Sequence, residues 1–143
     1  MFVGPLVAWA IARQGVTIAA RETWIRELRE NIAAFLSGYV AFRIHIRTHT
    51  TGDPDKEKRL AEINDSMNPP YHALCLLIAE RGTEYEAFGQ AIENLVNAPA
   101  NTVADRRREF MQEAERILRA ERAACAADPG VWSALWSGIR GRR

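Results

Sequence analysis

The chain has little cysteine, and its cysteines form no motif. Among 143 residues only Cys75 and Cys125 occur, and they do not have CxxC spacing. Two distant cysteines do not indicate a disulfide framework. Both have apolar or alanine-rich neighbours in the sequence, so we expect them to be small, buried core residues.

The sequence also lacks the motifs that mark common catalytic sites. Its nine glycines are scattered, and no phosphate loop, nucleophile elbow or dinucleotide fingerprint occurs. We therefore predict that the protein is not an enzyme. No cofactor and no small-molecule substrate is indicated.

A third feature that the chain lacks is an alternating apolar and polar run of strand length; apolar residues recur instead at helical spacing. With 48% apolar and 26% charged residues the composition is that of a folded protein, and the length suits one domain. We predict an all-α fold, an elongated antiparallel bundle of about four helices. A long helix opens it, and a short amphipathic tail follows it.

The first twelve residues carry no charge. As a helix this run covers about 18 Å, well short of the roughly 30 Å hydrocarbon core of a bilayer. No basic region precedes it, so it does not resemble a secretory signal. Three interpretations remain: the second half of a spanning helix whose upstream residues are missing, an interfacial anchor, or a helix start in the core. We interpret residues 1–20 as a membrane-anchor segment, truncated if the first interpretation holds.

Aromatic and basic residues near both ends support a membrane location. Trp9 and Arg13 close the apolar run, as at a membrane–water boundary with arginine on the cytoplasmic side. Trp132 and Trp136 lie in a tail, residues 129–143, that also has three arginines and no acid. Exposing these tryptophans to water is costly unless they cap the bundle or meet a partner or lipid headgroups. We predict a protein of the bacterial inner membrane, with membrane lipid as a partner and its helical domain on the cytoplasmic side.

The bundle itself is predicted to occupy residues 21–128. A first helix, from about residue 5 to residue 48, is indicated by apolar residues spaced three and four apart, which form one stripe. The stripe consists of Ile25, Leu28, Ile32, Phe35, Tyr39, Phe42 and Ile46.

Later helix boundaries follow from capping residues and prolines. Asp53 before Pro54 predicts the start of a second helix, whose apolar side includes Leu60, Ile63 and Met67. Asn68, Pro69 and Pro70 predict its end and the start of a third helix, which has a slip near Gly82 that indicates a kink or a short break. A joint at residues 97–101 precedes a fourth helix, residues 102–127, which Asp128, Pro129 and Gly130 terminate.

Residues 21–35 resemble a segment of uncharacterised bacterial membrane-anchored proteins, in which RQxWIxxLRxxIAxF follows an N-terminal transmembrane helix. Glu22 replaces the usual glutamine. An asparagine-proline step followed by histidine and leucine, another feature of these proteins, is similar to residues 68–74. The resemblance implies a membrane-proximal helical domain and no particular activity. The matching residues are Arg21, Trp24, Ile25, Leu28, Arg29 and Phe35, and then Asn68, Pro69 and His72.

Two groups of polar residues are candidate binding sites. His45 and His49, four residues apart, have a spacing that zinc sites use, but Asp53, Asp55 or His72 would have to complete the shell. We favour the interpretation that the two histidines are a pair at the end of a helix, and we predict that they bind no metal. Residues 106–108 are three consecutive arginines, followed by Glu109, Glu113 and Glu115. Pairing on a solvated helix face is favoured over a nucleic-acid patch.

The sequence therefore favours a non-enzymatic, membrane-associated helical module for protein–protein interaction or self-assembly. Its partner is another protein or a second copy of the chain. The alternative is a soluble helical regulatory or nucleic-acid-binding protein that uses the arginines.

Overall fold

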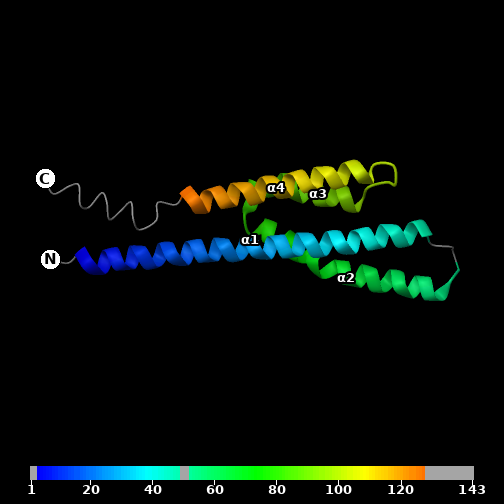
Figure 1. Ribbon diagram of the computed structural model, residues 1–143, viewed down its shortest axis with the longest axis horizontal. Coiled ribbons are helices and arrows are strands. Elements are labelled where there is room, and N and C mark those ends of the chain that lie inside the picture. Colours follow the sequence, from blue (N-terminus) through cyan, green and yellow to red (C-terminus); the bar gives the residue numbers. More distant parts are fainter. Residues whose placement is uncertain (1–2, 49–51, 128–143) are drawn as a thin grey trace. The chain divides into compact units, whose positions relative to one another are not determined.

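The computed structural model describes the backbone of residues 3–48 and 52–127, and the side chains of residues 17–48 and 52–126. It contains α1 (Val3–Thr48), α2 (Pro54–Ala79), a short 3-10 helix η1 (Gly82–Tyr85), α3 (Glu86–Val96) and α4 (Val103–Ala127) (Figure 1). No strand occurs within these ranges, and the predicted all-α bundle is confirmed. The predicted tail, with Trp132 and Trp136, lies outside the described residues.

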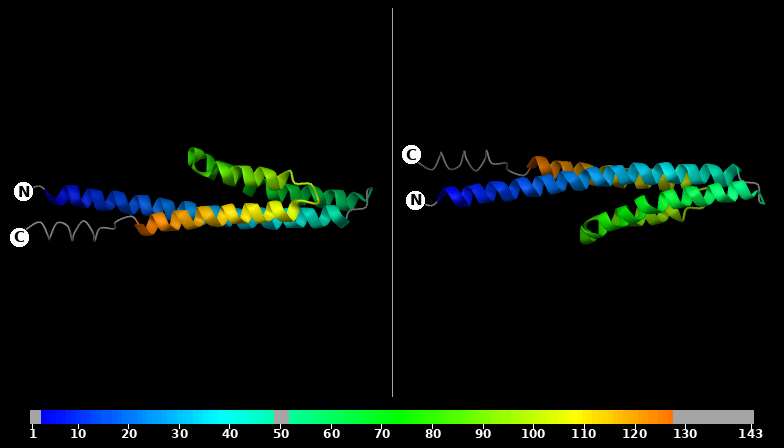
Figure 2. Two further views of the ribbon diagram at one scale, coloured as in Figure 1. Left: turned by 90° about the horizontal axis from the view of Figure 1, so that it is seen from above. Right: turned by 90° about the horizontal axis from the view of Figure 1, so that it is seen from below.

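The chain forms two compact units. The terminal unit comprises residues 1–25 and 116–143, and the central unit comprises residues 26–115. The central unit contains the end of α1, all of α2, η1 and α3, and the start of α4. Within it α2 runs back along α1, and α3 packs against α2 (Figures 1 and 2).

An aromatic cluster forms the core of the central unit. The Phe110 ring of α4 lies with its centroid 5.8 Å from that of Phe35 on α1 and 5.2 Å from that of Phe88 on α3. Tyr71 of α2 lies 6.2 Å from Phe35. The cluster therefore joins all four α-helices. Other fully buried side chains of this unit are Leu28, Leu74, Ile92 and Leu95, each of which stabilises the fold by roughly 1.5–3 kcal/mol.

The predicted apolar stripe of α1 is confirmed only as far as Tyr39. Its first five members are at most 8% exposed, whereas Phe42 is half-buried and Ile46 is 43% exposed. The aromatic core ends at Tyr39, and beyond it the α1 side chains are half-buried or exposed, although His45 still contacts the start of α2. The end of α1 thus leaves apolar side chains at the surface.

The start of α2 agrees with the sequence prediction. Asp53 is the N-cap, and its Oδ1 accepts a hydrogen bond of 3.1 Å from the Asp55 N–H, while Pro54 is the first helical residue. Where α1 and α2 meet, a Cβ atom on Gly38 would lie only 3.2 Å from the Cβ of Met67. Gly38 thus lets the two helices approach closely.

The predicted end of the second helix at Asn68, Pro69 and Pro70 is wrong, because α2 continues through both prolines to Ala79. The prolines remove the N–H groups that would bind the carbonyl oxygens of Asp65 and Ser66. Both of these residues are exposed, so water can replace the missing bonds. Burial on one side of the helix continues past the prolines and favours the unbroken helix; the buried residues are Met67, Leu74, Leu77 and Ile78.

The slip predicted near Gly82 is a real break in the helix. Gly82 has φ +62°, a left-handed conformation that glycine adopts without steric cost. It starts η1, after which α3 begins at Glu86. The predicted joint at residues 97–101 and the fourth helix are also confirmed, within one residue at its start.

The prediction that both cysteines are core residues is wrong. Cys75 is exposed and Cys125 is half-buried. Cys75 follows the buried Leu74 and precedes Leu76, which is 67% exposed. Successive helical residues point about 100° apart, so the buried side of α2 takes Leu74 and leaves Cys75 and Leu76 on the outside.

Within the described residues, no helix is both long enough and apolar enough to cross a membrane. The predicted anchor segment is helical from Val3 onward. The side chains of Trp9 and Arg13 lie outside the described residues.

Two glycine substitutions should have opposite effects on stability. Gly82→Ala forces a Cβ into the left-handed region and should lower the free energy of unfolding by roughly 1–2 kcal/mol. Gly89→Ala is the matched control, since its Cβ would lie within helix α3 at an ordinary 3.9 Å from Ile78 Cγ2, and it should raise stability by roughly 0.5–1 kcal/mol. Urea unfolding followed by circular dichroism measures both. Equal effects of the two substitutions would contradict the assigned break at Gly82.

Candidate functional site

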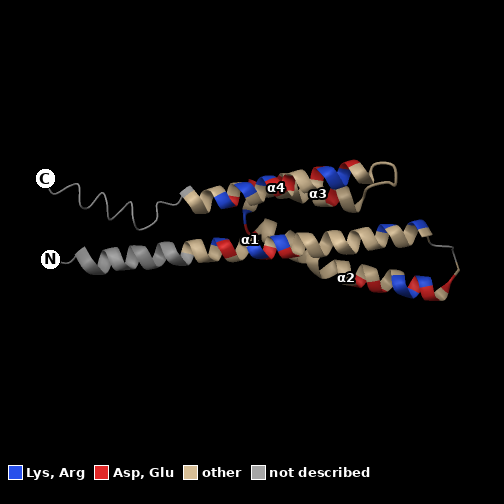
Figure 3. Cartoon of the chain, viewed as in Figure 1, with Lys and Arg blue, Asp and Glu red and all other residues tan. Residues whose placement is uncertain are grey.

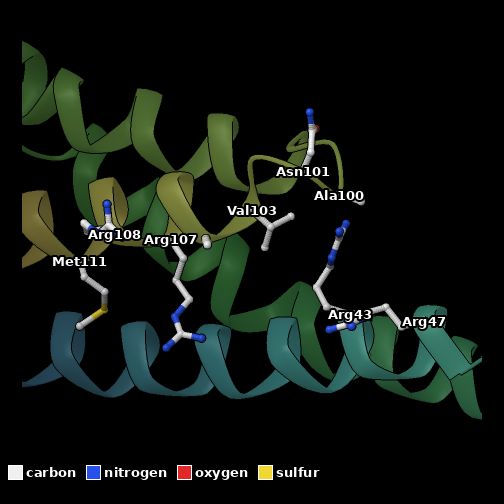
Figure 4. A pocket seen from close by; sticks show the side chains of 9 residues that line it. Arg43, Arg47, Ala100, Asn101, Val103, Arg107, Arg108 and Met111 are labelled. Atoms are coloured by element: carbon white, nitrogen blue, oxygen red, sulfur yellow. The ribbon is translucent and has the colours of Figure 1, made fainter.

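A groove of about 1030 Å³ lies between the end of α1 and the start of α4. Figure 4 shows Arg107 extending from α4 toward α1, and Arg43 extending from α1 toward the loop that carries Asn101. We call this feature the arginine groove. Its lining residues are Arg43, Arg47, Ala100, Asn101, Val103, Ala104, Arg107, Arg108 and Met111.

Helical spacing explains why these side chains share the groove. Arg43 and Arg47 are four residues apart on α1, so they lie on one face. On α4, Ala104, Arg107 or Arg108, and Met111 follow at three- and four-residue intervals. Two helix faces, each about two turns long, therefore form the walls. The blue segments at the end of α1 and near the start of α4 in Figure 3 mark their basic residues.

A hollow with several apolar side chains, which we call the groove floor, adjoins the arginine groove. This smaller hollow, of about 110 Å³, shares Arg43, Arg47, Val103 and Arg107 with the groove, and adds Tyr39, Val40 and Ile44. Val40 and Ile44 are 37% and 58% exposed. The site thus combines a cationic rim with apolar side chains that water still reaches.

Charge pairing leaves several of these arginines without a carboxylate. Arg108 Nη1 lies 3.4 Å from Asp105 Oδ1, and the neighbouring Arg106 Nη1 lies 2.8 Å from Glu109 Oε2. The predicted pairing with Glu109 is therefore confirmed for Arg106, whereas Arg108 pairs with Asp105, which the sequence analysis did not name. Within residues 17–48 and 52–126, no carboxylate forms an ion pair with Arg43, Arg47 or Arg107.

Tyr39 fixes the position of α1 at the edge of the groove. The side chain is 3% exposed, and its hydroxyl donates a hydrogen bond of 2.9 Å to the carbonyl oxygen of Leu95 at the end of α3. Burial raises the pKa of Tyr39, while the nearby Arg43 guanidinium acts in the opposite direction. The hydroxyl therefore keeps its proton at neutral pH and remains the donor.

His45, a weak metal candidate in the sequence, makes a structural contact instead. Its Nε2 lies 2.7 Å from the carbonyl oxygen of Lys56, and because a carbonyl only accepts, this nitrogen carries the proton. His49 lies outside the described residues. The part of the chain that the structure describes contains no group of three or more potential metal ligands. The hydrogen bond of His45 links the end of α1 to the start of α2.

In the terminal unit, the residues that carry the sequence resemblance make packing and ion-pair contacts. Trp24 and Ile25 are 7% and 8% exposed. Arg21 Nε lies 3.2 Å from Glu121 Oε2, and Glu121 is the one buried charged residue among the described side chains. An ion pair to a buried carboxylate links the motif to α4.

In the central unit the remaining residues of the resemblance separate into core and surface. Leu28 and Phe35 are fully buried, whereas Arg29 is exposed. Asn68, Pro69 and His72 lie exposed on α2. The second part of the resemblance therefore places its asparagine, proline and histidine at the surface and its leucine, Leu74, in the core.

Sequence reasoning missed the arginine groove as a site. Neither Arg43 nor Arg47 belongs to a motif that the sequence analysis singled out. The four-residue spacing of Arg43 and Arg47 was the available signal. Nothing in the sequence, however, predicted that the end of α1 would face the start of α4.

Comparison of the chain with protein-family models, with curated proteins and with solved structures gave no match. The functional argument therefore depends on the arrangement of the described residues.

Removing the charge of Arg21 should destabilise the fold. In Arg21→Gln, Glu121 loses an ion-pair partner at a buried position, which should lower the free energy of unfolding by roughly 1–3 kcal/mol. Arg119→Gln, at an exposed position of the same unit, is the control and should change stability by less than about 0.5 kcal/mol. Chemical denaturation of both variants provides the measurement. If Arg21→Gln were as stable as the control, the ion pair would contribute nothing.

Proposed function

We propose that the chain is a non-enzymatic helical module that binds other protein chains, with an acidic segment of the partner in the arginine groove. One observation carries the proposal. Arginines from two different helices converge on one groove, and Arg43, Arg47 and Arg107 have no carboxylate partner in the described part of the chain.

Physical chemistry supports an acidic partner. Like charges gathered in a concave surface repel one another and create a positive potential that attracts anions. A guanidinium forms bidentate hydrogen bonds with a carboxylate, so several arginines select for carboxylate-bearing segments. A bound acidic segment relieves the repulsion and gains directional hydrogen bonds.

The apolar floor supports a protein partner in particular. Val40 and Ile44 are exposed in the smaller hollow that adjoins the groove, and covering them with apolar side chains of a partner is favourable. Nucleic acid is the second candidate, because the same arginines also suit phosphate. Arg106 and Arg108, however, already pair with carboxylates on α4, and such acids repel a phosphate backbone.

Binding of fluorescent poly-L-glutamate, followed by anisotropy at low salt, tests the groove. Replacing Arg43 and Arg107 together by glutamine should weaken binding at least about tenfold, since the loss of one charge-assisted hydrogen bond costs roughly 1.5–3 kcal/mol. The control replaces Arg59 and Arg119, two arginines on exposed faces of α2 and α4, and should change affinity less than about twofold.

Two results would count against the groove. Equal losses in both double variants would show that binding depends on net charge alone. A duplex DNA probe that binds more tightly than poly-L-glutamate at the same salt would favour the nucleic-acid function.

We also propose that residues 1–20 attach the module to the bacterial inner membrane, with the bundle on the cytoplasmic side. The support comes from the sequence: the charge-free first twelve residues, with Trp9 near their end and Arg13 after it, and the resemblance of residues 21–35. In this arrangement the arginine groove is presented to partners in the cytoplasm.

Cell fractionation tests the membrane attachment. A tagged full-length protein should remain with the membrane fraction after a high-salt wash and be released by detergent, because apolar burial does not weaken with ionic strength. Replacing Leu6 and Ile11 together by aspartate should move the protein to the soluble fraction. Recovery of the unmodified protein in the soluble fraction without detergent would disprove the attachment.

A further inference from the structure

A second charged surface of the central unit complements the arginine groove. The segment from residue 80 to residue 102 contains four glutamates and a single basic residue, Arg81. The glutamates are Glu80, Glu84, Glu86 and Glu93; all four are exposed, and none forms an ion pair with a described lysine or arginine.

Helix α3 places two of these carboxylates on one face. Glu86 and Glu93 are seven residues apart, two helical turns or about 10 Å along the axis. Gln90 lies between them on the same face. We call this surface the α3 acidic face. Its length matches that of the groove walls, whose ends are also seven residues apart, from Val40 to Arg47 on α1 and from Ala104 to Met111 on α4.

Among the described α-helices, α3 alone has acidic residues and no lysine or arginine. The acids of α2 and α4 are interspersed with basic residues, which the groove arginines would repel. Val96, 42% exposed, lies one turn beyond Glu93 and supplies an apolar contact for the groove floor. Charge and apolar surface on α3 therefore both complement the groove.

We propose that the α3 acidic face of a second copy of this chain occupies the arginine groove, with Glu86 and Glu93 paired to Arg43, Arg47 and Arg107. This inference rests on the proposed function, since it names the partner of the same groove. The two surfaces share no residue, so every copy offers one groove and one acidic face. Such a head-to-tail interface builds rings or open chains of molecules and not closed dimers.

The chain's own C-terminal tail does not suit the groove. Residues 129–143 have three arginines and no acidic residue. Their charge has the same sign as that of the rim, so the tail cannot neutralise it. Charge complementarity thus selects the α3 acidic face over the tail.

Analytical ultracentrifugation of the full-length chain tests the proposal, with a mild detergent in every sample so that the apolar N-terminus does not cause association. The unmodified protein should form oligomers whose mass increases with protein concentration and decreases with added salt. Replacing Arg43 and Arg107 by glutamine, or Glu86 and Glu93 by glutamine, should each raise the dissociation constant at least about tenfold. Glu57→Gln with Glu62→Gln, on an exposed part of α2, is the matched control and should leave the mass unchanged.

Two further samples separate this interface from general charge effects. Each glutamine double variant keeps one intact surface, so an equimolar mixture of the two should form one-to-one dimers that do not extend. A variant with exchanged charges, Arg43→Glu and Arg107→Glu combined with Glu86→Arg and Glu93→Arg, should associate again. Circular dichroism establishes that every variant is folded.

The outcomes distinguish this inference from the function it rests on. A monomer at every concentration that still binds poly-L-glutamate in the groove would overturn self-association and leave the proposed function intact. Absence of both kinds of binding would overturn both. Oligomers that persist in either glutamine variant would show that another surface holds the copies together. An exchanged-charge variant that stays monomeric would contradict the direct pairing of these glutamates and arginines.

Discussion

The contact of Phe110 with Phe35 and Phe88 is the constraint on which the central unit depends. These three rings belong to α4, α1 and α3, and all are fully buried. A core cluster of this kind fixes the rotation of each helix about its axis, because aromatic side chains pack in few orientations. Once Phe110 faces the core, Arg107 and Met111 on α4 are directed toward the end of α1. The packing of the core therefore determines which side chains line the arginine groove.

The groove arises because that core stops short of the helix ends. Tyr39 is the last buried residue of α1, and its hydrogen bond to Leu95 closes the core. Beyond this point α1 continues to Thr48 without a packed neighbour over Val40 and Ile44. The last two turns of α1 extend past the core, so their side chains do not contribute to core packing. Arginine rims and exposed valine and isoleucine suit the binding of another protein surface.

Local sequence patterns predicted most of the helices. They did not predict features that depend on contacts between residues far apart in the sequence. The three- and four-residue spacing of apolar residues predicted α1, and Asp53 with Pro54 predicted the start of α2. Both signals are local, because caps and periodicity act within a few residues. The interpretation of Pro69 and Pro70 as a helix end failed, since burial of Met67 and Leu74 on either side overrides a local preference. The groove was not predictable, because its walls are about 60 residues apart in the sequence and come together through tertiary contacts such as the phenylalanine cluster.

The consecutive prolines in α2 divide that helix into two regions that can unfold separately. Two successive backbone hydrogen bonds are missing where these two regions meet. None of the residues from Pro54 to Ser66 is buried. Fraying that starts at Pro54 can therefore travel as far as the prolines without disturbing Leu74, Leu77 or Ile78. We therefore expect the half of α2 nearest the turn after α1 to open and close while the aromatic core stays intact, with its amide protons exchanging with solvent independently of global unfolding.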